Sequence, residues 1–214
     1  MVATRPPRSA LRGRHVRLEP LTRAQLPALF RAIGHPEVFA AGFGGGPHGL
    51  RDTEAGFAEW AEGYFHWEQG NPYAVILLGG PHDGELVGTT TLADFELDRE
   101  AAHIGWTAYD PRVWGTAVNP EAKLLLLSLA FEHGFGRVKI QTDVINERSR
   151  AAIAGLGATF EGVVRRDKPR ADGSWRDTAV FAITVDDWPE VRAGLERRLV
   201  RWKGRPVLFR GAGA

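Results

Sequence analysis

The sequence has no cysteine and a single methionine among its 214 residues. The lack of cysteine excludes a disulfide framework, a thiolate nucleophile and a thiol-based metal site, and it fits a chain that works in a reducing cytoplasm. No apolar run approaches the roughly 20 residues of a membrane-spanning helix, and the first residues lack the apolar core of a signal peptide. We therefore expect a soluble cytoplasmic protein with no membrane partner.

Excess charge of either sign is also lacking, because 27 lysine and arginine residues face 26 acidic ones and the formal net charge is +1. Without a basic field, a nucleic acid is not the expected partner, and a small or peptide-like molecule is. The histidines at 35, 48, 66 and 82 show no spacing typical of a metal site, so we predict no metal. A hydrophobic content of 43% is enough for a sizeable core.

Hydrophobic periodicity and turn residues divide the chain into about seven strands and about five helices. This mixture predicts an α+β fold with a mixed, mostly antiparallel central sheet flanked by helices. We expect a flexible leader over 1–11, a domain over 12–185, and a C-terminal helix and tail over 186–214 packed on the same domain. The expected strands are 16–21, 73–78, 86–95, 101–109, 137–144, 159–166 and 175–185, and the expected helices are 22–33, 53–69, 120–133, 148–156 and 188–202.

A glycine-rich tract, residues 39–50, precedes an aromatic-rich helix. So many glycines predict a flexible loop with no regular element, of the kind that can close over a binding pocket. The helix at 53–69 carries aromatic side chains around one broad face. Core packing explains them, and a wall of a binding pocket is a second interpretation that stays open.

The stretch 114–123 joins a small-residue turn directly to the start of a helix. Asn119 can cap that helix, Pro120 suits its first position, and Glu121 complements the positive end of its dipole. The apolar run 104–109 ahead of the turn reads as a strand. A strand followed by a turn with free N–H groups and a helix N-terminus predicts a phosphate or diphosphate site.

Two further motifs follow in order, Asn146-Glu147-Arg148-Ser149-Arg150 and the run 156–162, Leu-Gly-Ala-Thr-Phe-Glu-Gly. With the turn, they make residues 12–185 resemble the GNAT superfamily of acyl-CoA-dependent N-acetyltransferases, and within it the RimJ/RimL branch that acetylates ribosomal-protein N-termini. The resemblance implies a central sheet splayed in the middle to hold acyl-CoA, acetyl-CoA as the co-substrate, and an acceptor pocket shaped by the first two helices and their connection.

The diphosphate motif of the superfamily fits this chain in two registers. From Arg112 it fits literally through Gly115 and Ala117. From Trp114, Ala117 replaces the first glycine and Asn119 the second small residue. We prefer the second register because it keeps the distance to Glu121 that the branch shows. A Cβ at position 117 would then narrow the approach of the backbone to the phosphates and restrict a positive φ.

The resemblance also assigns contacts with acetyl-CoA. Main-chain groups of the strand would complete their hydrogen bonds with the pantetheine arm, as an added strand would, and the turn would hold the diphosphate. Asn146 would bridge to the pantetheine arm. The full expected set is Trp106, Thr107, Ala108, Tyr109, Trp114, Gly115, Thr116, Ala117, Val118, Asn119, Asn146, Ser149 and Arg150.

Direct attack of a neutral amine on a thioester needs a proton acceptor and a donor for the departing thiolate, and no covalent enzyme intermediate. Many relatives supply a tyrosine as the donor, at the position that is Ile153 here. Ser149 matches the serine of the RimJ/RimL branch and is our candidate donor; a second helix cap is its plainer role. His103 is the candidate base, since an imidazole titrates near neutral pH, with Asp94 and Glu96 as rivals.

The expected function is therefore transfer of an acetyl group to a primary amine, either a protein N-terminus or a small molecule, by a monomer or a homodimer. The alternative is a catalytically silent, CoA-binding regulatory module on the same fold. An unrelated nucleotide binder ranks last, because the glycine motifs of P-loop and dinucleotide-binding proteins are missing.

Overall fold

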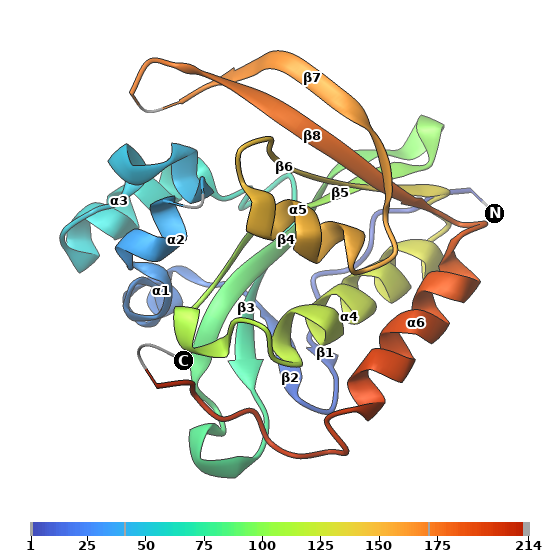
Figure 1. Ribbon diagram of the computed structural model, residues 1–214, viewed down its shortest axis with the longest axis horizontal. Helices are drawn as coiled ribbons and strands as arrows, with labels where there is room; N and C mark the ends of the chain where they lie inside the picture. Colours follow the sequence, from blue (N-terminus) through green and yellow to red (C-terminus); the bar gives the residue numbers. More distant parts are fainter. Residues whose placement is uncertain (1, 41, 171, 212–214) are drawn as a thin grey trace.

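The computed structural model describes residues 2–40, 42–170 and 172–211, and within them one eight-stranded sheet and six α-helices (Figure 1). The spatial order of the strands is β1-β2-β3-β4-β5-β6-β8-β7. All neighbours pair antiparallel except β5 and β6, which are parallel. The strands are β1 Leu11–Arg12, β2 Val16–Pro20, β3 Asn71–Leu77, β4 Leu86–Glu96, β5 Ala101–Tyr109, β6 Arg137–Asp143, β7 Thr159–Pro169 and β8 Trp175–Thr184; the helices are α1 Leu26–Ile33, α2 Pro36–Ala40, α3 Glu54–Tyr64, α4 Val118–Glu132, α5 Glu147–Ala154 and α6 Trp188–Val200.

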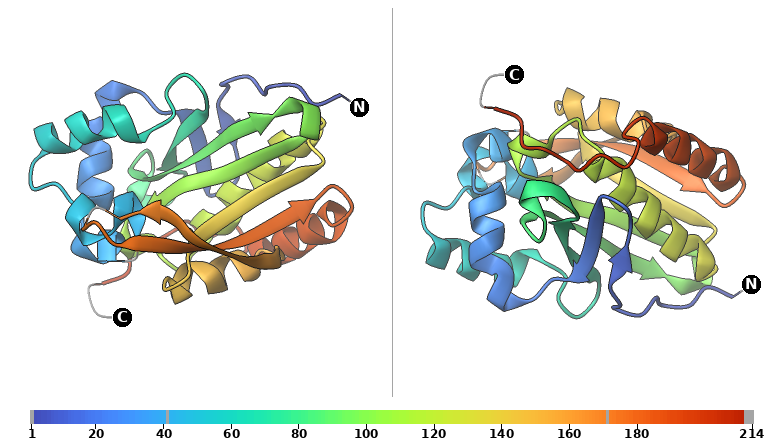
Figure 2. Two further views of the ribbon diagram at one scale, coloured as in Figure 1. Left: turned by 90° about the horizontal axis from the view of Figure 1, so that it is seen from above. Right: turned by 90° about the horizontal axis from the view of Figure 1, so that it is seen from below.

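Helices cover both faces of the sheet, and each face has its own core (Figure 2). The helices α4 and α6 bury leucines such as Leu126 and Leu195 against one face. On the other face, Leu29 of α1 and Phe57 of α3 pack against Ala74 and Ile76 of β3. Strand β3 is buried along its whole length, as a central strand covered on both sides must be.

The fold expected from the sequence is confirmed, with an additional two-residue strand, β1. Helix α3 begins after Thr53, whose side chain accepts from Gly56 N, as a capping residue does. It ends at Tyr64, earlier than expected. The reason is local, because the chain turns extended at Phe65 and the indole of Trp67 then donates to Ala61 O at 3.1 Å.

The expectation of a flexible leader over 1–11 is wrong for its described part. Ala3 is 3% exposed, and Thr4 N donates to His133 O at 2.9 Å. Asn71 Nδ2 donates to Pro6 O at 3.0 Å, and Leu11 pairs with Leu18. Tertiary partners that are distant in sequence hold this segment, and they leave no local signal.

The glycine tract also differs from its prediction. Helix α2 runs into it, and two single 3-10 turns follow at Phe43–Gly45 and Pro47–Gly49. Gly44 has a φ of +62°, and a Cβ there would lie 2.9 Å from the Phe39 ring. A Cβ at Gly49 would lie 2.2 Å from Gly44 O. These glycines permit left-handed backbone and close packing, so they are not in themselves a sign of mobility.

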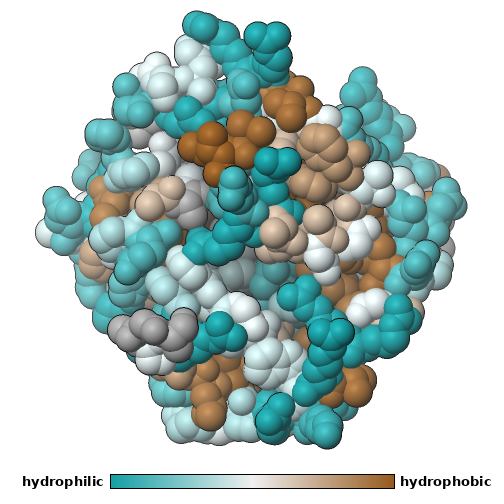
Figure 3. Space-filling model, in the orientation of Figure 1, coloured by the Kyte–Doolittle hydropathy of each residue, from teal (hydrophilic) through white to brown (hydrophobic). Residues whose placement is uncertain are grey.

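Strand β7 forms one of the two edges of the sheet, and apolar side chains gather over the β7–β8 hairpin on the face shown in Figure 3. Phe160, Val163, Val164 and Trp175 are between 43% and 49% exposed. The homodimer named above stays a prediction.

One buried carboxylate joins α4 to the start of the sheet. Glu121 is 4% exposed and accepts from the backbone N–H groups of Arg14, His15 and Val16 at 2.9, 2.6 and 2.7 Å. A Cβ at Gly13 would lie 2.5 Å from the Glu121 side chain, so the turn before β2 is shaped around the carboxylate. Hydrogen bonds to a charged acceptor are stronger than neutral ones. Glu121 therefore fixes the position of the first turn of α4.

We predict that Glu121→Gln lowers the free energy of unfolding by about 2–4 kcal/mol, because an amide offers one acceptor oxygen to three N–H groups. Urea denaturation measures the change. Glu132→Gln, at the exposed end of the same helix, is the matched control and should stay within about 0.5 kcal/mol of the parent. Equal stability of the two variants would contradict the role of the carboxylate.

Candidate active site

The sheet splits between its two parallel strands. Pairing of β5 with β6 covers Ala101 to Ile104 opposite Arg137 to Ile140 and ends there. On its other side β5 continues beside β4, with a bulge, since Thr89 pairs with Ala108 but Thr91 with Gly105. Trp106, inside the bulge, has a φ of +49°. The last part of β5 therefore turns away from β6 and leaves main-chain groups in need of partners.

A cavity of about 390 Å³ lies at this split and takes its lining from both faces of the sheet. The main chain and side chains of β5, the turn before α4 and the start of α5 all reach it. Of the residues expected from the sequence, those on the cavity are Trp106, Thr107, Ala108, Tyr109, Trp114, Gly115, Thr116, Asn119, Asn146 and Ser149.

The turn before α4 is built differently from its prediction. Helix α4 begins at Val118, so Asn119 is its second residue and does not cap it. Ala117 has a helical φ of −67° and is fully buried, and its Cβ imposes no strain. Ala117 and Val118 do not line the cavity. Gly115 is the residue with left-handed backbone, with a φ of +70°.

Some N–H groups of this turn are already used. Thr116 N donates to Val113 O at 3.3 Å, and Val118 N donates to Thr116 Oγ1 at 3.4 Å. Arg112, the first residue of the alternative register, binds Asp110 through Nε and Nη2 and stacks over Phe209. Its guanidinium is therefore committed elsewhere. The 15-residue helix still directs the positive end of its dipole to this part of the cavity.

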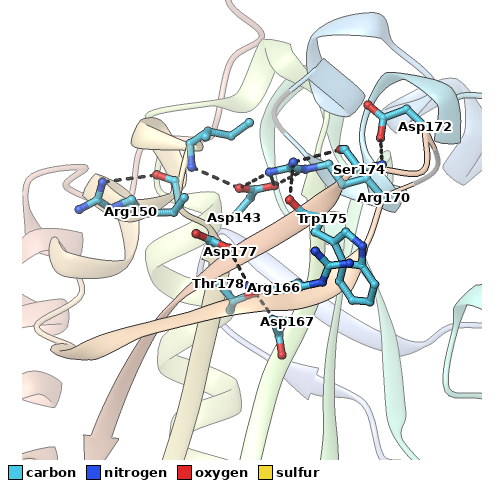
Figure 4. Close-up of polar contacts among 12 residues, drawn as sticks. Asp143, Arg150, Arg166, Asp167, Arg170, Asp172, Ser174, Trp175, Asp177 and Thr178 are labelled. Carbon is cyan, nitrogen blue, oxygen red and sulfur yellow. Dashed lines mark hydrogen bonds and ion pairs between the residues drawn. The ribbon is translucent and has the colours of Figure 1, made fainter.

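Arginines surround that helix start. The guanidinium of Arg148 lies 3.3 Å from the centre of the Trp114 ring, and Arg148 and Arg198 both line the cavity. From the C-terminal tail, Arg210 donates to Gly115 O at 3.4 Å. Arg150, the arginine expected from the motif, points elsewhere and donates to Val144 O (Figure 4). The motif therefore contributes Arg148 to the cavity in place of Arg150.

The start of α5 places Asn146 and Ser149 together on the cavity. Asn146 Oδ1 accepts from Ser149 N at 3.0 Å and caps the helix. Capping and a ligand contact are compatible roles for Asn146, as expected. The Ser149 side chain is half-buried on the cavity wall.

A buried lysine that the sequence did not reveal also lines the cavity. Lys123 of α4 is 4% exposed, and its Nζ donates to Thr90 Oγ1 at 3.0 Å and to Thr107 Oγ1 at 2.7 Å. The two hydroxyls also bond to each other at 2.8 Å. Burial lowers the pKa of Lys123 to about 7. This cluster lies directly beneath the bulge in β5.

The other end of the cavity is aromatic. Phe43 and Tyr64 line it with Trp106, while Phe57 and Phe65 lie in the core of that face. Phe43 packs edge-on against Tyr64 with ring centroids 5.3 Å apart, and Gly44 N donates to the Tyr64 hydroxyl at 3.3 Å. The aromatic helix thus contributes to the core and to a pocket wall at once.

Of the three candidate bases, His103 and Asp94 lie together, and Glu96 lies apart from them. His103 Nδ1 lies 2.9 Å from Asp94 Oδ2, whereas Glu96 pairs with Arg99 on the surface. Burial lowers the pKa of His103, and the hydrogen bond from His103 lowers that of Asp94. His103 is 4% exposed with its Nε2 buried, and it does not line the cavity. Its ring lies against Gly105, which does.

Comparison with known proteins identifies the family. The family model described as an acetyltransferase (GNAT) domain matches residues 15–159. This chain belongs to the GNAT acetyltransferases. A crystal structure of a protein from T. thermophilus, described as an acetyltransferase, is 36% identical, with 93% of this chain and 100% of that chain covered and a TM-score of 0.79. No curated protein matches the sequence.

Two structural neighbours at lower identity contain CoA. RimJ of Mycobacterium smegmatis, in complex with CoA-disulfide, is 22% identical, with 86% of this chain and 88% of that chain covered and a TM-score of 0.68. RimL, a ribosomal L7/L12 α-N-protein acetyltransferase in complex with coenzyme A, is 18% identical, with 81% and 96% covered and a TM-score of 0.65. At these identities the two proteins show a shared fold.

Neither a metal cluster nor a membrane-spanning helix is found in the described residues. No cluster of three or more histidine, aspartate or glutamate side chains there could hold a metal ion. None of the helices in the same part of the chain has the length and apolar character needed to cross a membrane.

A substitution at Gly115 tests whether the turn before α4 binds the phosphates of acetyl-CoA. We predict that Gly115→Val weakens acetyl-CoA binding by about tenfold or more, because valine disfavours the left-handed backbone and its Cβ would lie 3.2 Å from the Arg210 guanidinium. Isothermal titration calorimetry measures the affinity. Gly84→Val is the control, since Gly84 has a φ of +83° with open space around it, far from the cavity lining. Normal affinity in Gly115→Val would rule out this turn as the phosphate site.

Lys123 makes stability depend on pH. Its pKa falls from 10.5 to about 7 on folding, so the unfolded chain binds more protons between those values and wild-type stability rises with pH across that window. Lys123→Met removes the contribution of this lysine to the pH dependence of stability. We expect it to stabilise the protein at neutral pH by on the order of 1–3 kcal/mol, with the advantage shrinking towards alkaline pH. Urea denaturation across the window measures it, with exposed Lys168→Met as the control. If the free energies of unfolding of Lys123→Met and wild type differed by the same amount at every pH, the low pKa of Lys123 would be contradicted.

Proposed function

We propose that this GNAT acetyltransferase moves an acetyl group from acetyl-CoA to a primary amine by direct attack, without a covalent enzyme intermediate. The observation that carries the proposal is the end of β5–β6 pairing at Ile104 and Ile140, which opens a cavity bordered by main chain, a helix N-terminus and the start of α5. The RimJ/RimL-like character and the cytoplasmic location expected from the sequence stay predictions.

The residues present fit acyl-CoA along the length of the cavity. At one end, the start of α4 together with Arg148 and Arg198 offers N–H groups and positive charge to the phosphates. In the middle, the β5 edge from Trp106 to Tyr109 offers main-chain groups to the amides of the pantetheine arm, while the Tyr109 carbonyl already accepts from Trp114 Nε1 at 3.0 Å. Asn146 and Ser149 lie opposite that edge, at the start of α5.

Two side chains would then manage protons during transfer. As the C–N bond forms and the C–S bond breaks, the Ser149 hydroxyl donates a hydrogen bond to the departing sulfur. The His103–Asp94 pair is the candidate proton acceptor: its neutral imidazole keeps a lone pair at Nε2, beside the backbone of Gly105. Because His103 does not line the cavity, a proton from the amine would have to reach Nε2 indirectly. The aromatic end of the cavity would receive the acceptor.

The decisive assay combines binding and turnover. CoA release, followed with a thiol reagent over a panel of amines and N-terminal peptides, tests catalysis, and thermal shift with acetyl-CoA tests binding. Turnover with an amine supports the proposal. A clear shift without turnover favours the catalytically silent CoA-binding module, and no shift at all would overturn both.

For Ser149→Ala we predict a fall in kcat of roughly ten- to a thousand-fold with an acetyl-CoA dissociation constant within a few-fold of the parent, since the hydroxyl acts mainly in the transition state. Steady-state kinetics and calorimetry separate the two quantities. Ser9→Ala, at an exposed position, is the control. If kcat stays unchanged with a true acceptor, Ser149 is a structural residue of the α5 start and not a donor.

A further inference from the structure

The acceptor end of the cavity contains an arginine without a matching acid. Arg176 lies on β8 and lines the cavity near Phe43 and Tyr64. Its Nε is buried with no hydrogen-bond partner. Across residues 2–40, 42–170 and 172–211, every ion pair within 4.0 Å involves some other cation. A half-buried guanidinium with a buried Nε that lacks a hydrogen-bond partner is costly unless a ligand supplies an acceptor.

The nearby acids are already engaged. Asp143 also lines the cavity, but Arg170 binds both of its carboxylate oxygens at 2.8–3.0 Å, and Ile145 N donates to Oδ1 at 3.2 Å (Figure 4). Asp167 accepts from the Thr178 hydroxyl at 2.7 Å, and its charge acts on Arg176 through space without a direct contact. Figure 4 shows Arg170 reaching from the β7–β8 hairpin to the end of β6. The charge of Asp143 is thus compensated by Arg170.

The remaining neighbour is a neutral phenol. Burial raises the pKa of Tyr64 to about 12, so its hydroxyl is protonated at physiological pH. Burial lowers the pKa of Arg176, yet a guanidinium stays charged in proteins. The acceptor end of the cavity therefore combines an aromatic wall with a guanidinium that no acid in the described part of the chain contacts within 4.0 Å, and the carboxylates of Asp143 and Asp167 act on it only from a greater distance.

We propose that Arg176 binds a carboxylate of the acceptor, so that the acceptor is an amine that also carries a carboxylate, such as an amino acid. A guanidinium matches a carboxylate through two parallel hydrogen bonds, and partial burial strengthens them. The aromatic side chains of Phe43, Tyr64 and Trp106 would pack against the rest of the acceptor. This inference rests on the proposed function and narrows its acceptor.

Matched acceptors test the carboxylate. Initial rates are compared for free amino acids, their carboxamides, and peptide amides with or without a glutamate in the second position. We expect wild-type kcat/KM to favour the carboxylate over the carboxamide by about tenfold or more. Preference for the free amino acid places the carboxylate on the α-carbon, and preference for the glutamate peptide places it on a side chain. Equal rates throughout would overturn the inference.

Variants assign the preference to one residue. Arg176→Gln should lower kcat/KM for the carboxylate acceptor by about ten- to a hundred-fold and change that for the carboxamide by only a few-fold. Arg176→Lys keeps the positive charge but loses the planar guanidinium with its two parallel donors. Its kcat/KM for the carboxylate acceptor should therefore lie between those of wild type and Arg176→Gln. Exposed Arg165→Gln on β7 is the matched control. Equal loss for both acceptors in Arg176→Gln would contradict carboxylate recognition.

A binding measurement tests the same inference without depending on turnover. Calorimetry on the CoA-saturated protein compares an N-acetylated amino acid with its carboxamide, and we expect tighter binding of the carboxylate in wild type and no preference in Arg176→Gln. Equal binding in wild type would overturn the inference. Failure of the proposed function would give a different result. Acetyl-CoA would then cause no thermal shift, or no amine would be acetylated.

Discussion

The parallel pairing of β5 with β6 ends halfway along both strands, and the site depends on that ending. A sheet that stayed paired would satisfy its own backbone groups and leave nothing for a ligand. Here the bulge at Trp106 turns β5 away after Ile104. Because the crossover from β5 to β6 runs through α4, the N-terminus of that helix opens at the same place.

Helix α4 is held in this position by two polar side chains that are buried inside the protein. Glu121 binds the turn before β2, and Lys123 binds Thr90 and Thr107 beneath the bulge. Buried polar groups need hydrogen-bond partners in place of water, and both side chains have them, although burial still disfavours the charged form of Lys123. Two positions in one helical turn therefore connect the edge of the sheet, the bulge and the phosphate end of the cavity. Their hydrogen bonds define the helix position more narrowly than leucine packing alone would.

The fold was predictable because its signals are local. Alternating apolar residues marked the strands, Thr53 and Asn146 capped the helices expected after them, and three ordered motifs indicated the family. Predictions failed where a distant partner decides the outcome. The leader is held by residues far along the chain. The first turn of α4 begins at Val118 without an Asn119 cap, and the distant contact of Glu121 with the turn before β2 holds it.

The same distinction divides the site. Main-chain positions on β5 and at the turn were readable, since they follow from a strand, a turn and a helix in order. The choice of Arg148 over Arg150, and the burial of His103 beside Asp94, depend on which way each side chain points. Lys123 had one faint signal, as a lone cation in a leucine-rich helix, and Arg176 had none beyond its place on a strand. Cavities are made by several elements at once, and no single stretch encodes them.

The contact between the Glu121 carboxylate and the backbone of residues 14–16 also affects how the chain folds. Its three hydrogen bonds join positions 105 to 107 residues apart. Contacts at such separations cost loop-closure entropy before they return any stabilisation, and they slow folding. Hairpins such as β3–β4 and β4–β5 close much shorter loops and are expected to form sooner. On this view the helix end that faces the cavity reaches its final position late, after the sheet exists to receive it.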